Sequence, residues 1–245
     1  MRGLYNRLCD AVRFRRAFAL YRFCDGEMKY ALADEWDAEH FDEPEACIKN
    51  GVGVHKYYPD LSHRLREILE DLENEEWAIL GINWEFYSSW EPIRKFLWQY
   101  DIMCHEGTVF HKASKYGLLL YFFKALLSVT PDILLVGNRQ WRNWNAKAGG
   151  HWFDPATMLV SVPPRGGWEY YFHILKKLNL LLQQRKKHTV VLFACGAMSN
   201  VFIYDIRKLF PGNTYLNIGS ALDPYCGVLS RRYMRRTPEI ARLKK

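Results

Sequence analysis

Short apolar runs alternate with amphipathic segments along this chain. Six runs are of the length and composition expected for buried strands, at 17–23, 77–82, 133–136, 157–162, 189–194 and 214–218. Between them, apolar residues recur at helical spacing in 62–74, 91–100, 114–127 and 168–184. Strands separated by helices predict a mostly parallel sheet, because parallel neighbours need a long crossover connection. We therefore predict an α/β sandwich of three layers.

Three further helices are expected. Leu4, Leu8 and Val12 recur at helical spacing before the first strand, and further patterns follow Gly26 and Gly196. For the segment 62–74, Asp60 or Ser62 is available as the N-cap. Ligands of such folds bind beyond the carboxyl ends of the strands, so the residues after each apolar run are the candidates for chemistry.

Composition indicates an ordinary globular protein. Of 245 residues, 49% are hydrophobic and 25% are charged, and no repeat or linker divides the chain, so we predict a single domain over 1–245. The longest apolar run, 118–123, is far shorter than the roughly 20 residues of a membrane span. No transmembrane segment is expected.

Cysteine spacing and the first residues indicate the compartment. The six cysteines form no C-x-x-C pair, which favours reduced thiols and a cytoplasmic protein over a zinc ribbon or a redox dithiol. The arginine-rich first residues lack the apolar block of a secretory signal, and a mitochondrial presequence stays an alternative.

Positive charge gathers near the end of the chain. The formal net charge is +7, and a basic tail begins at about residue 230. This tail is either simply solvated or contacts an anionic partner, such as a membrane surface, a nucleic acid or a phosphorylated substrate. Charge by itself does not choose among these.

Two carboxylates follow the first predicted strand. If the chain is still extended there, Asp25 and Glu27 project to the same side and suit a divalent cation, Mg²⁺ or Mn²⁺, beside a nucleotide diphosphate. The alternative is that Asp25 caps the next helix and Glu27 lies in its first turn.

The turn after residue 194 is a candidate phosphate site. A strand passes through Gly196 into a helix that starts near Ser199, and the first N–H groups of a helix favour anions. No complete P-loop or dinucleotide fingerprint is present, so a purely structural turn is an equal alternative.

Two further strand ends carry polar or aromatic residues. After the fourth run, Arg165 offers a planar fork for phosphate and Trp168 a face for a nucleobase. The last run delivers Gly219 and Asp223 to the same edge, although turn chemistry accounts for both. Arginines and tryptophans also interleave in 138–147, which suits a single-stranded nucleic acid or simple docking on the core.

In order, these segments resemble the GT-D type glycosyltransferases, a metal-dependent family that uses nucleotide sugars. The resemblance rests on Arg22–Glu27, Pro163–Trp168, Gly196–Met198, Tyr204–Ile206 and Asn217–Gly219. It implies a Rossmann-like sheet of the GT-D type. The chain departs from the family pattern in having Cys24 for glycine, Gly166 for asparagine, Ala197 for proline and Asn217 for aspartate, which puts the donor preference in doubt.

The resemblance also implies roles for individual residues. Asp25 and Glu27 would hold Mn²⁺ or Mg²⁺ and the donor diphosphate and act in catalysis. The transfer also needs a base for the acceptor hydroxyl, and Glu27, Asp223 and Asp154 are its candidates. The nucleotide would be bound by Arg22, Gly26, Arg165, Trp168, Gly196, Ser199 and Gly219.

The predicted activity is that of a metal-dependent hexosyltransferase. It would move a sugar from a nucleotide sugar, UDP-linked by preference, to a hydroxyl on a glycan, lipid-linked or protein-linked acceptor. A methyltransferase or another nucleotide-cofactor enzyme, a nucleic-acid-binding module and a non-catalytic binding subunit are the alternatives. Metal dependence would distinguish the glycosyltransferase from a methyltransferase, and a steep salt dependence of binding would identify a nucleic-acid binder.

Overall fold

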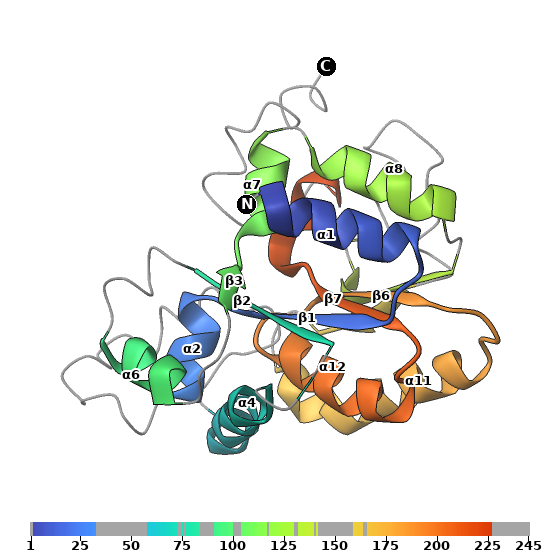
Figure 1. Ribbon diagram of the computed structural model, residues 1–245. Coiled ribbons are helices and arrows are strands. Elements are labelled where there is room, and N and C mark those ends of the chain that lie inside the picture. The colour runs from blue at the N-terminus through green and yellow to red at the C-terminus, as the bar shows by residue number, and fades with distance from the viewer. Residues whose placement is uncertain are drawn as a thin grey trace.

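A seven-stranded parallel sheet forms the centre of the protein. The computed structural model describes residues 2–32, 58–72, 75, 77–83, 91–99, 104–116, 118–129, 132–139, 141, 159–163 and 166–226. The strand order is β3-β2-β1-β7-β6-β4-β5, and all six neighbouring pairs are parallel (Figure 1). The predicted α/β class with a Rossmann-like sheet is confirmed.

Six of the strands coincide with the predicted apolar runs. The strands are β1 (Phe18–Phe23), β2 (Ala78–Ile82), β3 (Cys104–Glu106), β4 (Ile133–Asn138), β5 (Leu159–Val162), β6 (Val190–Ala194) and β7 (Thr214–Asn217). β3 escaped prediction because it has three residues, Cys-His-Glu, without an apolar run, and lies at the edge of the sheet.

Helices cover both faces of the sheet. One layer contains α2 (Asp25–Ala31), α4 (Pro59–Asp71), α6 (Glu91–Gln99), α11 (Tyr171–Gln183) and α12 (Met198–Leu209). The other contains α1 (Arg2–Arg13), α7 (Val109–Lys115), α8 (Leu119–Val129) and the 3-10 helix η6 (Gly219–Cys226). Along β1, Tyr21 packs into the first core and Leu20 into the second. Burial on both faces accounts for the uninterrupted apolar runs.

Three predicted helix boundaries differ from the structure. The pattern at 114–127 belongs to two helices, α7 and α8, and 168–184 divides into the 3-10 helix η5 (Gly167–Tyr170) and α11. α4 begins at Pro59 after Tyr58, so neither Asp60 nor Ser62 is its N-cap. Proline suits the first helical position because its missing N–H would have no helical partner there. Ser62 instead donates its hydroxyl to the carbonyl of Tyr30, at 2.6 Å.

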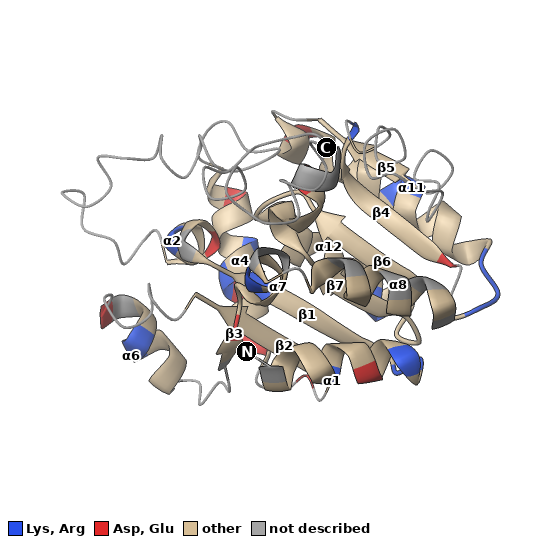
Figure 2. Cartoon of the chain, turned by 90° about the horizontal axis from the view of Figure 1, so that it is seen from above, with Lys and Arg blue, Asp and Glu red and all other residues tan. Residues whose placement is uncertain are grey.

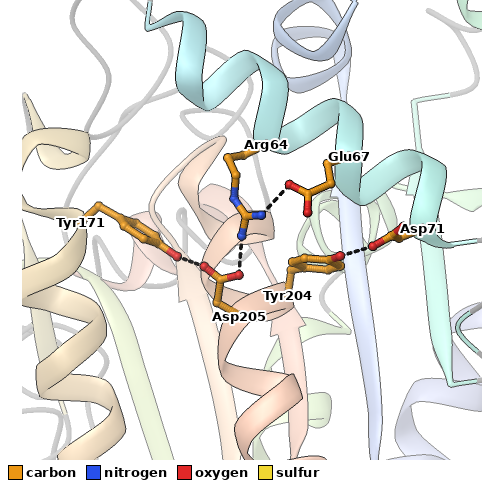
Figure 3. Close-up of polar contacts among 6 residues, drawn as sticks. All are labelled: Arg64, Glu67, Asp71, Tyr171, Tyr204 and Asp205. Atoms are coloured by element: carbon orange, nitrogen blue, oxygen red, sulfur yellow. Dashed lines mark hydrogen bonds and ion pairs between the residues drawn. The ribbon is translucent and has the colours of Figure 1, made fainter.

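A polar cluster fastens α4 to α11 and α12 (Figure 3). Asp205 accepts hydrogen bonds from Tyr171 and Arg64, and Tyr204 donates to Asp71. Burial raises the pKa of the Tyr204 phenol, and its bond to Asp71 raises this pKa further, so it stays protonated as a donor. The Tyr204–Asp205 segment of the GT-D resemblance therefore holds the helical layer together.

Some predicted features lie outside the described residues. These are the basic tail from about residue 230, Arg165, Asp154 and the interleaved segment beyond residue 141. None of the helices in the described part is long and apolar enough to cross a membrane. A single domain over 1–245 stays a prediction.

Candidate functional site

The loops after β1 and β7 diverge at the carboxyl edge of the sheet. The chain leaves β1 into α2, in one helical layer, whereas it leaves the neighbouring β7 into η6, in the opposite layer. Such a divergence is the position at which open α/β sheets bind ligands. We call the residues at the carboxyl ends of β1 and β7, with those of α2, α7 and η6 that touch them, the switch-point site.

Arg22 is the buried cation of this site. Its guanidinium donates from Nε to the carbonyl of Gly107 at 2.5 Å and from Nη2 to the sulfur of Cys24 at 3.2 Å, and only 5% of the residue is exposed. A buried guanidinium needs such acceptors, since each unsatisfied N–H would cost free energy. Arg22 thus places a fixed positive charge beneath the switch point and joins β1 to the turn after β3.

Gly219 is required where it stands. Its φ is +54°, in the left-handed region that favours glycine, and a Cβ there would lie 2.0 Å from Nη1 of Arg22. Gly219 is predicted to lie near the nucleotide, and the structure shows that its lack of a side chain also leaves the space that the Arg22 guanidinium occupies.

Two asparagines lock the strands together beneath the site. Asn200 of α12 accepts from the backbone N–H of Arg22 at 3.1 Å and donates to its carbonyl at 2.8 Å. Asn217 donates to Oδ1 of Asn200 at 2.8 Å and accepts from the N–H of Gly219 at 3.1 Å. An amide can do both, whereas an ionised aspartate only accepts. The partner Asn200 thus explains why asparagine suits position 217, where the GT-D pattern has aspartate.

His111 and Ser220 extend the site from Arg22 toward η6. Nη2 of Arg22 lies 3.4 Å from Nδ1 of His111, and Nε2 of His111 lies 3.2 Å from Oγ of Ser220. A guanidinium only donates, so Nδ1 is the acceptor and the imidazole proton lies on Nε2, directed at Ser220. The oxygen of Ser220 thereby accepts a hydrogen bond from His111, and its own hydroxyl can donate to a ligand at the switch point.

The predicted carboxylate pair lies at the start of a helix. α2 begins at Asp25, so the extended geometry assumed for Asp25 and Glu27 is wrong. The N-cap is Cys24 and not Asp25, and Glu27 bonds back to the N–H of Cys24 at 3.2 Å in a capping box. A Cβ added at Gly26 would meet nothing within 4 Å, so the space next to this residue is open. The side chain of Asp25 lies outside the described part.

Glu106 fixes the turn that supports Arg22. Its carboxylate accepts from Nζ of Lys112 at 2.6 Å and from the N–H of Thr108 at 2.9 Å. Burial acts to raise the pKa of Glu106, but the bonds from Lys112 and Thr108 outweigh it and leave this pKa lowered. The turn also brings Gly107 against β2, where a Cβ would come within 2.8 Å of the Gly81 carbonyl carbon.

The turn after β6 keeps its serine inside. Gly196 has a φ of +62°, and Oγ of Ser199 accepts from the N–H of Cys195 at 3.0 Å. Ser199 is fully buried, so its hydroxyl belongs to the turn. The N–H groups of Ser199 and Asn200 donate to the carbonyls of Gly196 and Ala197, at 3.0 and 3.3 Å, so this first turn of α12 satisfies them within the protein.

Trp168 lies apart from the Arg22 contacts, and Asp223 is bound by a buried tryptophan. Nε1 of Trp168 donates to Asp60 at 2.8 Å, and its ring packs on Tyr171 with centroids 4.7 Å apart. Asp223, a residue of η6, is buried and accepts from Nε1 of Trp141 at 3.0 Å. The structure therefore gathers Arg22, Gly219 and the start of α2 in one place, and holds Trp168 at the far end of the edge.

Sequence reasoning missed three contributors. His111 and Gly107 depend on β3, whose short sequence carries no strand signal. Asn200 lies in the first turns of α12, and its pairing with Asn217 joins positions 17 residues apart. Within the described part, no group of three His, Cys, Asp or Glu residues could hold a metal ion by itself.

Comparison with known proteins identifies the fold. No protein-family model and no curated protein matches the chain. A solved structure of a glycosyltransferase (DUF1792) from Streptococcus sanguinis matches with a TM-score of 0.56 and 20% identity, over 88% of this chain and 80% of that one. A structure of the domain of unknown function 1792, described as having a distinct glycosyltransferase fold, matches with a TM-score of 0.54 and 16% identity, over 87% and 76%. The chain therefore has the fold of DUF1792 glycosyltransferases, as its resemblance to the GT-D type implied.

Proposed function

We propose that this protein is a metal-dependent glycosyltransferase that moves a sugar from a nucleotide sugar, UDP-linked by preference, to a hydroxyl of a glycan or glycoconjugate. One observation carries the proposal. The fold it shares with a glycosyltransferase places Asp25-Gly26-Glu27 at the end of β1, beside the switch point where such sheets bind ligands.

The residues at the start of α2 fit a hard divalent cation. Mg²⁺ and Mn²⁺ in nucleotide sites take one or two carboxylates together with phosphate oxygens, so a cluster of three protein ligands is not required. The capping bond of Glu27 is compatible with this, since a carboxylate has about four acceptor positions. Residues two apart in a helix do not face each other, so Asp25 or Glu27, rather than the two together, would hold the ion along with phosphate oxygens of the donor. When bound, the ion would neutralise the donor diphosphate.

The protein's own groups favour departure of the diphosphate. Breaking the bond between sugar and phosphate adds negative charge to the nucleoside diphosphate, and donors fixed in advance stabilise such charge. The buried Arg22 would supply positive potential, and Ser220, whose oxygen lies 3.2 Å from Nε2 of His111, would supply a hydroxyl donor.

The acceptor hydroxyl must also lose its proton. Asp223 is buried against Trp141, an arrangement that suits holding η6 in place better than reaching an acceptor. We therefore prefer a carboxylate at the start of α2 as the base, and Glu27 is the described one.

The test is a thermal-shift and donor-hydrolysis assay with UDP and nucleotide sugars, with and without Mn²⁺. A ligand at 100 times its Kd should stabilise the native state by about 2.7 kcal/mol. We expect this Mn²⁺-dependent shift, and the hydrolysis, in the wild type and in Asp10→Asn, an exposed carboxylate on α1 chosen as the control. Both should be lost in Asp25→Asn and Glu27→Gln.

Two outcomes would contradict the proposal. Unchanged hydrolysis in Asp25→Asn at limiting Mn²⁺ would remove the carboxylate pair from the mechanism. A shift with S-adenosylmethionine, and none with any nucleotide sugar, would identify the protein as a methyltransferase.

A further inference from the structure

Exposed apolar side chains gather at the amino-terminal edge of the sheet. Phe14 precedes β1, Trp77 precedes β2 and Leu209 lies before β7, with exposed fractions of 62%, 55% and 56%. All strands are parallel, so their amino ends share one edge, opposite the switch-point site. Three large apolar side chains in contact with water therefore belong to one end of the molecule.

Basic residues lie at the same edge of the sheet. Arg13, Arg15 and Arg16 lie at the end of α1, and Lys186 and Lys187 lie between α11 and β6, all of them exposed. Figure 2 shows the end of α1 and the segment after α11 in blue on the same side of the molecule. The guanidinium carbons of Arg13 and Arg16 lie 6.0 and 5.7 Å from the centre of the Phe14 ring.

Hydrogen bonds join the segments that carry these residues. Thr214 donates its hydroxyl to the carbonyl of Arg16 at 2.8 Å and lies 2.9 Å from Nε2 of His188. The N–H of Thr189 donates to Asn213 at 2.9 Å. The three segments before β1, β6 and β7 thus form one connected surface.

The backbone at Arg15 is strained. α1 ends with bonds from the N–H of Arg15 to Val12 and from that of Arg16 to Ala11, an arrangement that usually places glycine at the position of Arg15. Arg15 has a φ of +51° and is the one residue other than glycine with a positive φ in the described part. The charged side chain is present here despite a conformation that glycine adopts more easily.

Two of the described acidic groups near this edge are already ion-paired. Asp132 is ion-paired with Arg185, and Glu75 with Arg207. Asp10 is exposed on α1, and the sequence also places Glu73 and Glu76 just before Trp77, so five basic residues stand against these three carboxylates.

We propose that this amino-edge surface, made of Arg13–Arg16, Trp77, Lys186, Lys187 and Leu209, docks the protein on a bilayer rich in anionic lipid headgroups. Lysine and arginine are attracted to such headgroups, and exposed tryptophan, phenylalanine and leucine enter the interface between headgroups and acyl chains. The aliphatic Leu209 has no stacking role toward a nucleic acid, which favours the lipid surface.

Docking at this edge sets the orientation of the site. β1 has six residues, so the switch-point site lies about 20 Å from the bilayer side of the sheet. The donor site then faces the aqueous phase. Lipid binding needs no donor or activity, so it is tested independently of the proposed function.

The test is flotation of the full chain with vesicles of phosphatidylcholine, alone or mixed with phosphatidylglycerol. We expect binding to the mixed vesicles only, and weaker binding at high salt. Trp77→Ser with Lys186→Gln and Lys187→Gln should bind at least about 25-fold more weakly, because each lysine near an anionic surface contributes about fivefold. These exposed positions should leave the melting temperature unchanged.

A matched control lies on α6. Trp98 is 80% exposed and has Arg94 and Lys95 beside it, so Trp98→Ser with Arg94→Gln and Lys95→Gln removes the same groups away from this edge. The control should bind like the wild type. Equal binding by both variants would overturn the proposal and assign any lipid binding to another basic segment. Binding of an RNA oligonucleotide by the wild type, without binding of vesicles, would overturn it as well.

Discussion

Replacing Gly219 by alanine tests whether Arg22 organises the switch-point site. The added Cβ would lie 2.0 Å from Nη1 and 3.1 Å from Cζ of the Arg22 guanidinium, far inside contact distance. Gly219 follows β7. This strand is not free to move, because its last residue, Asn217, is hydrogen-bonded to Asn200 of α12. The guanidinium should therefore be the group that is displaced.

The expected cost follows from two contributions. Alanine at a φ of +54° costs about 1 kcal/mol. Displacing the guanidinium breaks its bond from Nε to the Gly107 carbonyl, and a hydrogen bond from a charged donor contributes about 1.5–3 kcal/mol. We expect Gly219→Ala to lower the free energy of unfolding by about 2.5 to 4 kcal/mol, out of roughly 5–15 kcal/mol for a typical domain.

Urea denaturation followed by tryptophan fluorescence measures this change. Gly212→Ala is the control, because a Cβ at that position meets nothing within 4 Å, and it should stay within about 0.5 kcal/mol of the wild type. Lysine has no atom at the position of Nη1, so in an Arg22→Lys background Gly219→Ala should cost only about 1 kcal/mol. The double-mutant cycle should thus give a coupling of about 2 kcal/mol.

The reasoning is refuted if Gly219→Ala is as stable as Gly212→Ala. It is refuted as well if Gly219→Ala costs the same in the wild-type and Arg22→Lys backgrounds, since the contact between the Cβ and the guanidinium would then have no energetic consequence.

Three other substitutions test the same region. Asn217→Asp should lower stability by about 1–3 kcal/mol, because a carboxylate would face the carbonyl oxygen of Asn200, and Asn217→Ser should restore part of the loss in the same urea assay. Glu106 has a lowered pKa in the folded state, so its contribution to stability is present above the unfolded-state pKa near 4.3 and is lost as pH falls below it. Melting temperatures between pH 6 and pH 3 should therefore fall less steeply in Glu106→Gln than in the wild type, and parallel curves would contradict this. His111→Leu should raise the KM for the donor several-fold with little change in kcat. His111→Gln can still donate to Ser220, so it should recover much of the affinity for the donor. Identical kinetics of the two variants would show that His111 has no part in donor binding.

The proposed sugar transfer and the proposed lipid docking use opposite edges of one sheet. The switch-point site lies at the carboxyl ends of the strands, and the amino-edge surface lies at their amino ends. A parallel sheet separates these two sets of loops by the length of a strand. A variant at one edge should therefore leave the measurement at the other edge unchanged.

The sequence determined the sheet and its two helical layers. Strands buried on both faces must be apolar throughout, so six of the seven appear as uninterrupted runs, and residues such as Tyr21 and Leu20 serve opposite cores. β3 was missed because an edge strand of three residues needs no such run. The Arg22–Glu27 segment and the turn at Gly196 were found for a similar reason, since each directly follows a recognisable strand.

The tertiary structure alone decided what these residues contact. Nothing local distinguishes an extended Asp25–Glu27 segment from the first turn of a helix, and the capping box of Glu27 with Cys24 became visible only in three dimensions. The hydrogen bonds of Arg22 with Gly107 and with Asn200 join positions 85 and 178 residues apart. Periodicity reports which face of an element is buried, whereas the partner of a buried polar group depends on strand order, which the chain adopts only when its layers pack.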